Sequence, residues 1–388
     1  MLCPPIEGHH VASRRIIEAA TSAGIAASVA TVELDSSIGK IPRNWHAADL
    51  RGKFNLQIPL LQPAFSVFYE LLMSLRIAEE VKFSDCDLVH VLNMNKEAYL
   101  LAHKLVRERK PLFLHFYHSP YVLGDDVFLL RSLALRLGLY GRNLGNYVLT
   151  VNASMAKFLV ERTGADPQRV QVVPYPIDTH RFKPMSCKQR LREKYGLPPD
   201  SSIIAYVGSL HPARGLSVLM RSLSIILSRF PKLLLLVSHP NHKSEEGYKQ
   251  YLYNQILNLG FQKNMLILGP SAEVEEIYNL ADVIVLPFQR PYWVDPPLVL
   301  LEAMSCGAAV VTTLVGATAE LLKSNENAVV VEPGNHEVLA ESVMRTIENP
   351  DMSIKIARKA RETIIKDYSY EVVGRKMLGL YELALSLC

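Results

Sequence analysis

A short loop between an apolar strand and an amphipathic helix carries the clearest chemical signal in the chain. It reads YVGSLHPARG from Tyr206 to Gly215, and a helical pattern begins near Gly215. Such a turn directs backbone N–H groups and the positive end of a helix dipole toward a ligand. Arg214 can grip a diphosphate there through paired, charge-assisted hydrogen bonds. The alternative is a plain strand–loop–helix connection with a solvated arginine.

A second signal lies in a proline-rich segment that leads into an apolar helix. Asp295 precedes Pro296, which is typical of a helix start with an acidic N-cap, and Gly307 suits the residue just past the helix end. This capping role is favoured for Asp295. Glu302 is the charged residue within the helix, and burying a carboxylate is costly unless it is hydrogen-bonded. A ribose cis-diol would satisfy Glu302; a surface position or an internal salt bridge is the alternative.

A histidine follows one of the predicted strands of the first half. His118 comes shortly after the strand 112–116, at the edge where parallel sheets bind their ligands. His115 lies within that strand and is expected to point elsewhere. A lone histidine is more often structural than functional, so His118 is a candidate only in combination with the two signals above.

The elements that position these residues alternate between short apolar runs and helical patterns, which is typical of parallel sheets covered on both faces. In the first half we expect strands at 25–32, 87–92, 112–116, 147–151 and 170–173, with helices near 9–23, 64–83, 95–109, 126–143 and 153–164. In the second half we expect strands at 203–207, 233–237, 265–268, 283–286, 309–312 and 328–331. Helical patterns at 351–366 and 370–386 end the chain. The fold class is therefore α/β, with doubly wound parallel sheets.

Length and proline content divide the chain into two domains. Its 388 residues exceed what one hydrophobic core usually supports. Five prolines gather between residues 174 and 199, where they stop helices and central strands. We place the domains at 1–183 and 184–366, followed by a final helix at 367–388. Few residues precede the first helix, so the first strand is either very short or lost because the gene begins upstream; the second option is slightly favoured.

Composition argues against several classes of protein. The 42 basic and 38 acidic residues give a net charge of +4, which is too small an excess to indicate a nucleic-acid partner. The five cysteines are scattered without CxxC spacing, which favours a reduced cytosolic interior over disulfides or a zinc site. No run approaches the ~18 consecutive apolar residues of a membrane span, and charged residues interrupt the start of the chain where a signal peptide would be apolar.

Together these patterns resemble the large retaining glycosyltransferase family four, whose members have the GT-B fold of two facing Rossmann-like domains. The resemblance spans nearly the whole chain and is clearest at residues 172–184 (VVPYPIDTHRFKP), 204–219, 267–288 and 298–320. The segment 268–270 (LGP) follows the family's donor-base region, which implies that Pro270 contributes to donor binding. The segment 367–370 (DYSY) resembles the start of the family's last helix, which crosses back to the first domain.

The phosphate loops match the family in part. Ser209 follows Gly208, where the family usually has an arginine, and Arg214 matches the family's next lysine, so one positive charge is kept. Gly8 resembles the glycine loop of the first domain, near the phosphates and the acceptor, although the usual pair of glycines is reduced to one.

The acidic pair of the family is also altered. Its two glutamates, separated by seven residues, fall on Val294 and Glu302. The resemblance implies that Glu302 holds the ribose, and that Asp295 restores a carboxylate at the reacting sugar carbon if the loop shifts by one residue. His118 matches the family's cleft histidine approximately and would position the donor sugar.

The resemblance implies a metal-independent, retaining hexosyltransferase that moves a sugar from a nucleoside diphosphate sugar to an acceptor hydroxyl, with the domains closing to exclude water. The implied catalytic residues are His118, Arg214 and Asp295. The implied donor-binding residues are Gly8, Gly208, Ser209, Arg214, Pro270 and Glu302. No cofactor or metal is expected. The acceptor is expected to be a glycan, a lipid-linked compound or a small molecule, and the protein to be cytoplasmic or peripheral at the inner membrane face. A catalytically weak donor-binding subunit and a GT-B epimerase are the alternatives.

Overall fold

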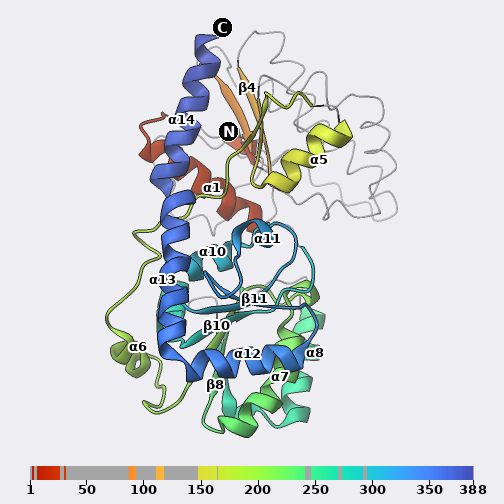
Figure 1. Ribbon diagram of the computed structural model, residues 1–388, viewed down its shortest axis with the longest axis vertical. Coiled ribbons are helices and arrows are strands. Elements are labelled where there is room, and N and C mark those ends of the chain that lie inside the picture. The colour runs from red at the N-terminus through yellow and green to blue at the C-terminus, as the bar shows by residue number, and fades with distance from the viewer. Residues whose placement is uncertain are drawn as a thin grey trace, which may run out of the picture. The chain divides into compact units, whose positions relative to one another are not determined.

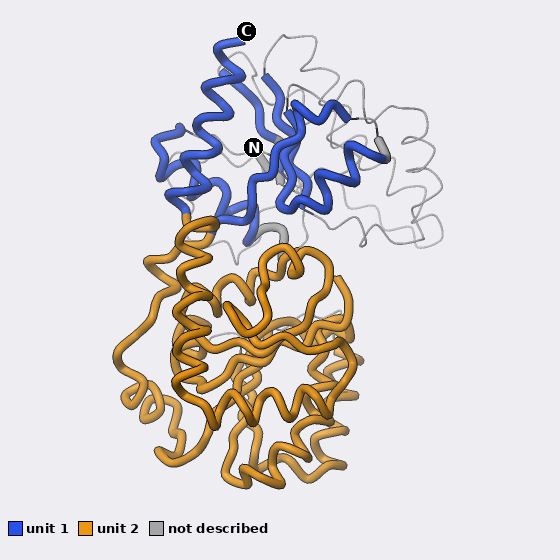
Figure 2. Tube along the Cα trace, viewed as in Figure 1, with its two compact units in different colours: residues 1–176, 370–388 blue, residues 177–369 orange. Residues whose placement is uncertain are grey.

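The computed structural model divides the chain into two compact units (Figure 2). Unit 1 comprises residues 1–176 and 370–388, and unit 2 comprises residues 177–369. The structure describes residues 2–3, 7–26, 30–31, 87–92, 111–117, 147–163, 165–240, 246–269, 273–291 and 295–387.

Unit 1 contains a parallel sheet with the strand order β2-β1-β3-β4-β5-β6. Its strands are β1 (Leu2–Cys3), β2 (Ala30–Thr31), β3 (Val89–Leu92), β4 (Leu112–Phe116), β5 (Tyr147–Thr150) and β6 (Val170–Val172). Its described helices are α1 (Glu7–Ser22), α5 (Ala153–Thr163) and α14 (Tyr370–Ser386). The short first strand is present, because β1 pairs with both β2 and β3 in the interior of the sheet.

Within the strand expected at 25–32, the structure has β2 at residues 30–31, and residues 27–29 and 32 lie outside the described residues. The way that α1 ends excludes Ile25 from the strand. Gly24 adopts a left-handed φ of 88°, the Gly24 N–H donates to Thr21 O at 3.0 Å, and the Ile25 N–H donates to Ala20 O at 3.1 Å. This pair of bonds is the Schellman motif that closes helix C-termini. Ile25 therefore belongs to the helix cap and is not available to start the strand.

The last helix of the chain packs on α1 within unit 1. Gly374 of α14 lies against the backbone of α1, so that a Cβ at this position would come within 2.4 Å of the Ala19 carbonyl oxygen. The Tyr370 hydroxyl donates to the Glu18 carboxylate at 2.7 Å. Val373, Met377, Tyr381 and Ala384 form the buried stripe of α14.

Replacing Gly374 with alanine is expected to destabilise the protein, because the new methyl group meets backbone and cannot be accommodated without moving the helix. We expect a loss of roughly 1–3 kcal/mol, the range for overpacking a close contact. Gly379→Ala is the matched control on the same helix, since nothing lies within 4 Å of its Cβ position. It should be neutral or stabilising by up to about 1 kcal/mol. Urea unfolding of the full chain measures both, and equal stabilities would contradict the close packing.

Unit 2 contains a second parallel sheet, of which Figure 1 labels β8, β10 and β11. The strand order of this sheet is β12-β11-β10-β7-β8-β9. Its strands are β7 (Ile203–Val207), β8 (Leu234–Ser238), β9 (Met265–Leu268), β10 (Val283–Leu286), β11 (Val310–Thr313) and β12 (Val329–Val331). Its helices are α6 (Lys188–Lys194), η6 (Pro212–Arg214), α7 (Leu216–Arg229), α8 (Glu246–Leu259), η8 (Gln262–Asn264), α9 (Val274–Leu280), α10 (Leu298–Ser305), α11 (Thr318–Leu321), α12 (His336–Glu348) and α13 (Pro350–Asp367).

The sheet of unit 2 is covered on both faces. Helices α7, α8 and α12 share a hydrophobic core with alternate strand residues such as Ile204 and Tyr206 of β7. Side chains alternate across a strand, so the intervening residues face the other side; there α9 contacts β7 and α10 contacts β11. Burial on both faces explains why these strands read as continuous apolar runs in the sequence.

The segment that follows residue 176 packs on unit 2, whereas we placed the domain boundary at 183/184. Arg181 forms two hydrogen bonds to the Glu275 carboxylate, at 3.0 and 3.1 Å. The Phe182 carbonyl accepts from the Ser305 hydroxyl at 2.6 Å and from Arg361 at 3.1 Å. Because of these contacts with α9, α10 and α13, residues 177–183 belong to the second unit.

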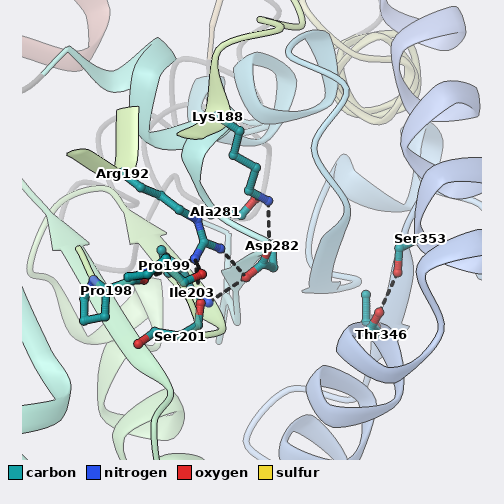
Figure 3. Close-up of polar contacts among 10 residues, drawn as sticks. All are labelled: Lys188, Arg192, Pro198, Pro199, Ser201, Ile203, Ala281, Asp282, Thr346 and Ser353. Atoms are coloured by element: carbon teal, nitrogen blue, oxygen red, sulfur yellow. Dashed lines mark hydrogen bonds and ion pairs between the residues drawn. The ribbon is translucent and has the colours of Figure 1, made fainter. Parts of the chain in front are cut away.

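Asp282 fastens the proline-rich segment to the amino edge of the second sheet (Figure 3). Its carboxylate accepts from the Ile203 N–H at 2.7 Å, from Lys188 at 2.6 Å and from Arg192 at 3.4 Å. Arg192 also donates to the carbonyls of Pro199 and Ser201, both at 2.9 Å. This edge of β7 and β10 is therefore occupied by the protein's own chain.

Candidate functional site

The order of strands in unit 2 reverses between β7 and β10. From β7 the chain passes to β8 and β9 on one side, and then continues with β10, β11 and β12 on the other. In doubly wound sheets, ligands bind beyond the carboxyl ends of the strands at such a point of reversal. The loop 208–215 follows β7, and the described residues 287–291 and 295–297 follow β10. These segments contain Gly208, Ser209, Arg214 and Asp295, four of the residues predicted for the site.

The loop after β7 begins with Gly208, whose backbone conformation is adopted easily only by a residue without a Cβ. Gly208 has a φ of 142°, and its N–H donates to the Ser238 carbonyl at the end of β8, at 3.0 Å. The Tyr206 hydroxyl donates to the Ser209 carbonyl at 2.7 Å. Two neighbouring strand ends and a buried tyrosine therefore fix the backbone of Gly208 and Ser209.

His211 shapes the next turn of the loop. Its Nδ1 accepts from the Ala213 N–H at 3.2 Å and caps the one-turn helix η6. Burial lowers the pKa of His211, and the positive charges of Arg290 and Arg214 lower that pKa further. The imidazole is therefore neutral at pH 7, which is the state in which Nδ1 can accept a hydrogen bond.

Gly215 brings the two loops into contact. It has a left-handed φ of 79°, and a Cβ at this position would lie 1.8 Å from the Pro287 carbonyl oxygen. The Gln289 N–H donates to the Ala213 carbonyl at 2.8 Å, which joins the loops a second time. Helix α7 starts directly after Gly215, so the positive end of its dipole lies at this junction.

Arg214 lies over an aromatic ring of the neighbouring loop. The centre of its guanidinium is 5.5 Å from the ring centroid of Phe288, within the range of a cation–π contact. The Phe288 ring is 2% exposed, and its carbonyl accepts from the Thr313 hydroxyl at 2.6 Å. A half-buried positive charge thus lies at the reversal point against a buried ring, and the backbone of that phenylalanine is hydrogen-bonded to β11.

Glu302 is buried in α10 and is hydrogen-bonded to a tyrosine. The side chain is 6% exposed, and its Oε2 accepts from the Tyr278 hydroxyl of α9 at 2.8 Å. Tyr278 is 1% exposed. This bond differs from the two alternatives considered from the sequence, a surface position and a salt bridge. A neutral hydroxyl donates to the carboxylate and fixes its direction.

The interpretation of Asp295 as the N-cap of the following helix is wrong. Helix α10 begins at Leu298, and the residue before it is Pro297. The Asp295 carboxylate instead accepts from the Ala317 N–H, with both oxygens at 2.9 Å. The partner is 22 residues away in the sequence, directly before α11, where a local helix signal gives no indication of it.

The remaining predicted residues are distributed as follows. His118, Pro270 and Val294 lie outside the described residues. Gly8 lies in the first turn of α1 and not in a loop before it, because the helix begins at Glu7. His115 is fully buried within β4, and its Nε2 lies 3.1 Å from the Val173 carbonyl oxygen.

Three residues of this edge were missed in the sequence: Gln289, Thr313 and Gly316. Each follows or ends a strand of the second sheet, β10 for Gln289 and β11 for the other two. Because the carboxyl ends of parallel strands meet at one edge, polar residues and glycines just beyond them are the available signal. Their partners, however, lie on other loops and cannot be identified from local spacing.

The part of the chain that the structure describes contains neither a candidate metal site nor a candidate membrane span. Within the described ranges, no group of three or more His, Cys, Asp or Glu side chains is arranged to hold a metal ion. Likewise, none of the helices that the structure describes is long and apolar enough to cross a lipid bilayer.

Comparison with known proteins identifies the family. The family model for glycosyl transferases group 1 matches residues 188–363, and the model for glycosyltransferase family 4 matches residues 8–181. The two matches together cover most of the chain. The chain belongs to this family of glycosyltransferases, as the resemblance in its sequence predicted.

Individual relatives are distant. YtcC of Bacillus subtilis is 22% identical over 80% of this chain and 76% of its own length. The D-inositol 3-phosphate glycosyltransferase of Rhodococcus jostii is 26% identical over 58% of this chain, and the match spans only 50% of that relative. Anabaena HepE, solved in complex with UDP-glucose, superposes with a TM-score of 0.74 at 19% identity and covers 98% of both chains. This likeness confirms the α/β GT-B fold.

Replacing Gly215 with alanine is expected to separate the two loops, because the methyl group would overlap the Pro287 carbonyl. Gly196→Ala is the matched control: Gly196 also has a left-handed φ, of 63°, but nothing lies within 4 Å of its Cβ position. The control should cost about 1–2 kcal/mol for the left-handed conformation alone. Gly215→Ala should cost roughly 1–3 kcal/mol more for the overlap. Urea denaturation of the full chain compares them, and similar losses would refute the contact.

Proposed function

We propose that this glycosyltransferase moves a hexose from a nucleoside diphosphate sugar to an acceptor hydroxyl, with retention of the anomeric configuration and without a metal ion. The observation that carries the proposal is the position of Arg214. Its charge lies over Phe288 at the β7–β10 reversal, where doubly wound sheets bind ligands. The complex of HepE with UDP-glucose supports a donor of this chemical class.

The leaving diphosphate is the group that Arg214 would stabilise. As the bond to the sugar breaks, negative charge grows on the diphosphate oxygens, and a fixed cation in a partly buried site stabilises that charge. The start of α7 beside Gly215 adds the positive end of a helix dipole. Gly208 and Ser209 provide the backbone that would lie along the phosphates. Together these groups would supply the electrostatic stabilisation that a metal ion supplies elsewhere.

Glu302 would bind the ribose of the donor. A carboxylate oxygen accepts hydrogen bonds from a cis-diol, and Tyr278 holds this carboxylate in one orientation. The roles of His118 at the donor sugar, Pro270 at the base and Gly8 near the phosphates stay predictions. So do the nature of the acceptor, whether a glycan, a lipid-linked compound or a small molecule, and a cytoplasmic or peripheral location.

A second candidate function is a sugar-nucleotide-binding subunit with weak catalysis. Two observations favour it: Ser209 replaces a family arginine, and the Asp295 carboxylate is bonded to Ala317. Tight donor binding without transfer to any acceptor would favour this candidate. Where transfer does occur, proton NMR of the first-formed product reports the anomeric configuration, and an inverted product would overturn the proposed stereochemistry.

Arg214→Ala is expected to lower turnover by at least ~10²-fold, the usual effect of removing one group that stabilises transition-state charge. Arg221→Ala is the matched control, because Arg221 is exposed on the same stretch of chain, within α7. The donor is first identified by a thermal-shift panel of nucleoside diphosphates and their sugar conjugates, since a ligand at a hundredfold over Kd stabilises by about 2.7 kcal/mol. Unchanged turnover in Arg214→Ala would remove this residue from the mechanism.

A further inference from the structure

Phe288 and Asp295, which lie between β10 and α10, are both hydrogen-bonded to the turn that follows β11. The Phe288 carbonyl accepts from the Thr313 hydroxyl at 2.6 Å. The Asp295 carboxylate accepts from the Ala317 N–H, with both oxygens at 2.9 Å. Thr313 is the last residue of β11, and Ala317 directly precedes α11.

The turn that holds the loop is itself well fixed. The Thr318 hydroxyl accepts from the Val315 N–H at 2.7 Å and lies within hydrogen-bonding distance of the Val315 and Thr313 carbonyls, at 2.8 and 3.2 Å. Thr318 is fully buried. The turn 313–318 is therefore held in shape by hydrogen bonds of its own, independently of Asp295.

Asp295 is enclosed by this turn. Its side chain is 2% exposed. Gly316 has a left-handed φ of 54°, and a Cβ there would lie 2.3 Å from the Asp295 Oδ2. Ala317 is also buried, so if the carboxylate turned toward a substrate, the Ala317 N–H would lose this bond in a site shielded from water. Such an unpaired buried donor is costly.

We infer that Asp295 is a positioning residue rather than a catalytic carboxylate: it fastens the chain just before α10 to the turn 313–318, and so places the start of α10, which carries Glu302, toward the donor. The inference rests on the proposed function and revises the role implied by the family resemblance. In this role Asp295 needs an oxygen that accepts a hydrogen bond from Ala317. It does not need to present a negative charge to the sugar.

Asparagine and alanine at position 295 separate the two roles. Asp295→Asn keeps an oxygen that can accept from the Ala317 N–H, but it removes the charge. If Asp295 is a positioning residue, Asp295→Asn should keep kcat and the donor KM within about threefold. Asp295→Ala should raise the donor KM by about tenfold or more, because the hydrogen bond from the Ala317 N–H is lost. A catalytic carboxylate predicts that both variants lose kcat alike, and that result would overturn the inference.

Gly316 tests the same contact from the other side. Gly316→Ala should push the carboxylate away and reproduce the effect of Asp295→Ala, whereas Gly260→Ala, with a left-handed φ of 71° and nothing within 4 Å of its Cβ position, should not. The double variant Gly316→Ala/Asp295→Ala should be no worse than Asp295→Ala alone, because the methyl group then has no carboxylate to displace. Additive losses would contradict the contact.

Hydrogen exchange of the full chain distinguishes failure of this inference from failure of the proposed function. Amide exchange in residues 313–318 should rise in Asp295→Ala and stay near the wild-type rate in Asp295→Asn, whether or not a donor sugar is transferred. If the panel of nucleoside diphosphate sugars shows no binding, the proposed function fails while this readout still stands. Equal exchange in Asn, Ala and wild type would refute the positioning role.

Discussion

The carboxyl edge of the second unit depends on the close approach of two backbone segments at Gly215. Strands β7 and β10 are neighbours, and the loops that leave them must pass each other within van der Waals distance. A side chain at residue 215 would overlap the Pro287 carbonyl, and the left-handed backbone there also favours glycine. Because the loops touch, the Gln289 N–H reaches the Ala213 carbonyl, and the Phe288 ring comes to lie beneath Arg214.

The two edges of this sheet differ in the charged groups that they carry. At the amino edge, the Asp282 carboxylate is neutralised by Lys188 and Arg192 of the same chain. At the carboxyl edge, Arg214 is supported by an aromatic face, and the neighbouring His211 is kept neutral by burial and by the nearby arginines. The positive character of this edge comes from arginine and the α7 dipole, which suits an anionic ligand such as a diphosphate.

Much of the second unit could be predicted from the sequence, because its strands appear as continuous apolar runs, and β7, β10 and β11 are buried along their whole length. The strands 203–207, 265–268 and 283–286 were predicted with the bounds that the structure has. The strand expected at 25–32 was started too early, because the Schellman motif at Gly24 places Ile25 in the cap of α1.

The site was harder to predict than the fold, since its contacts join residues far apart in the sequence. The local pattern Asp295-Pro296 indicates a helix cap, yet the partner of Asp295 is the N–H of Ala317, which the pattern does not contain. Glu302 was correctly singled out as a buried carboxylate in need of a partner, but Tyr278, on another helix, could not be assigned to it. Pairings of this kind depend on the order of strands, which spacing alone does not provide.

Hydrogen–deuterium exchange of the full chain, with and without the nucleoside diphosphate that binds it, tests most directly whether the donor occupies the carboxyl edge between β7 and β10. The account predicts slower exchange in residues 208–218 and 287–291 on binding, with little change at the amino edge around Asp282. Protection confined to other parts of the chain, or no nucleotide-dependent change at all, would contradict it.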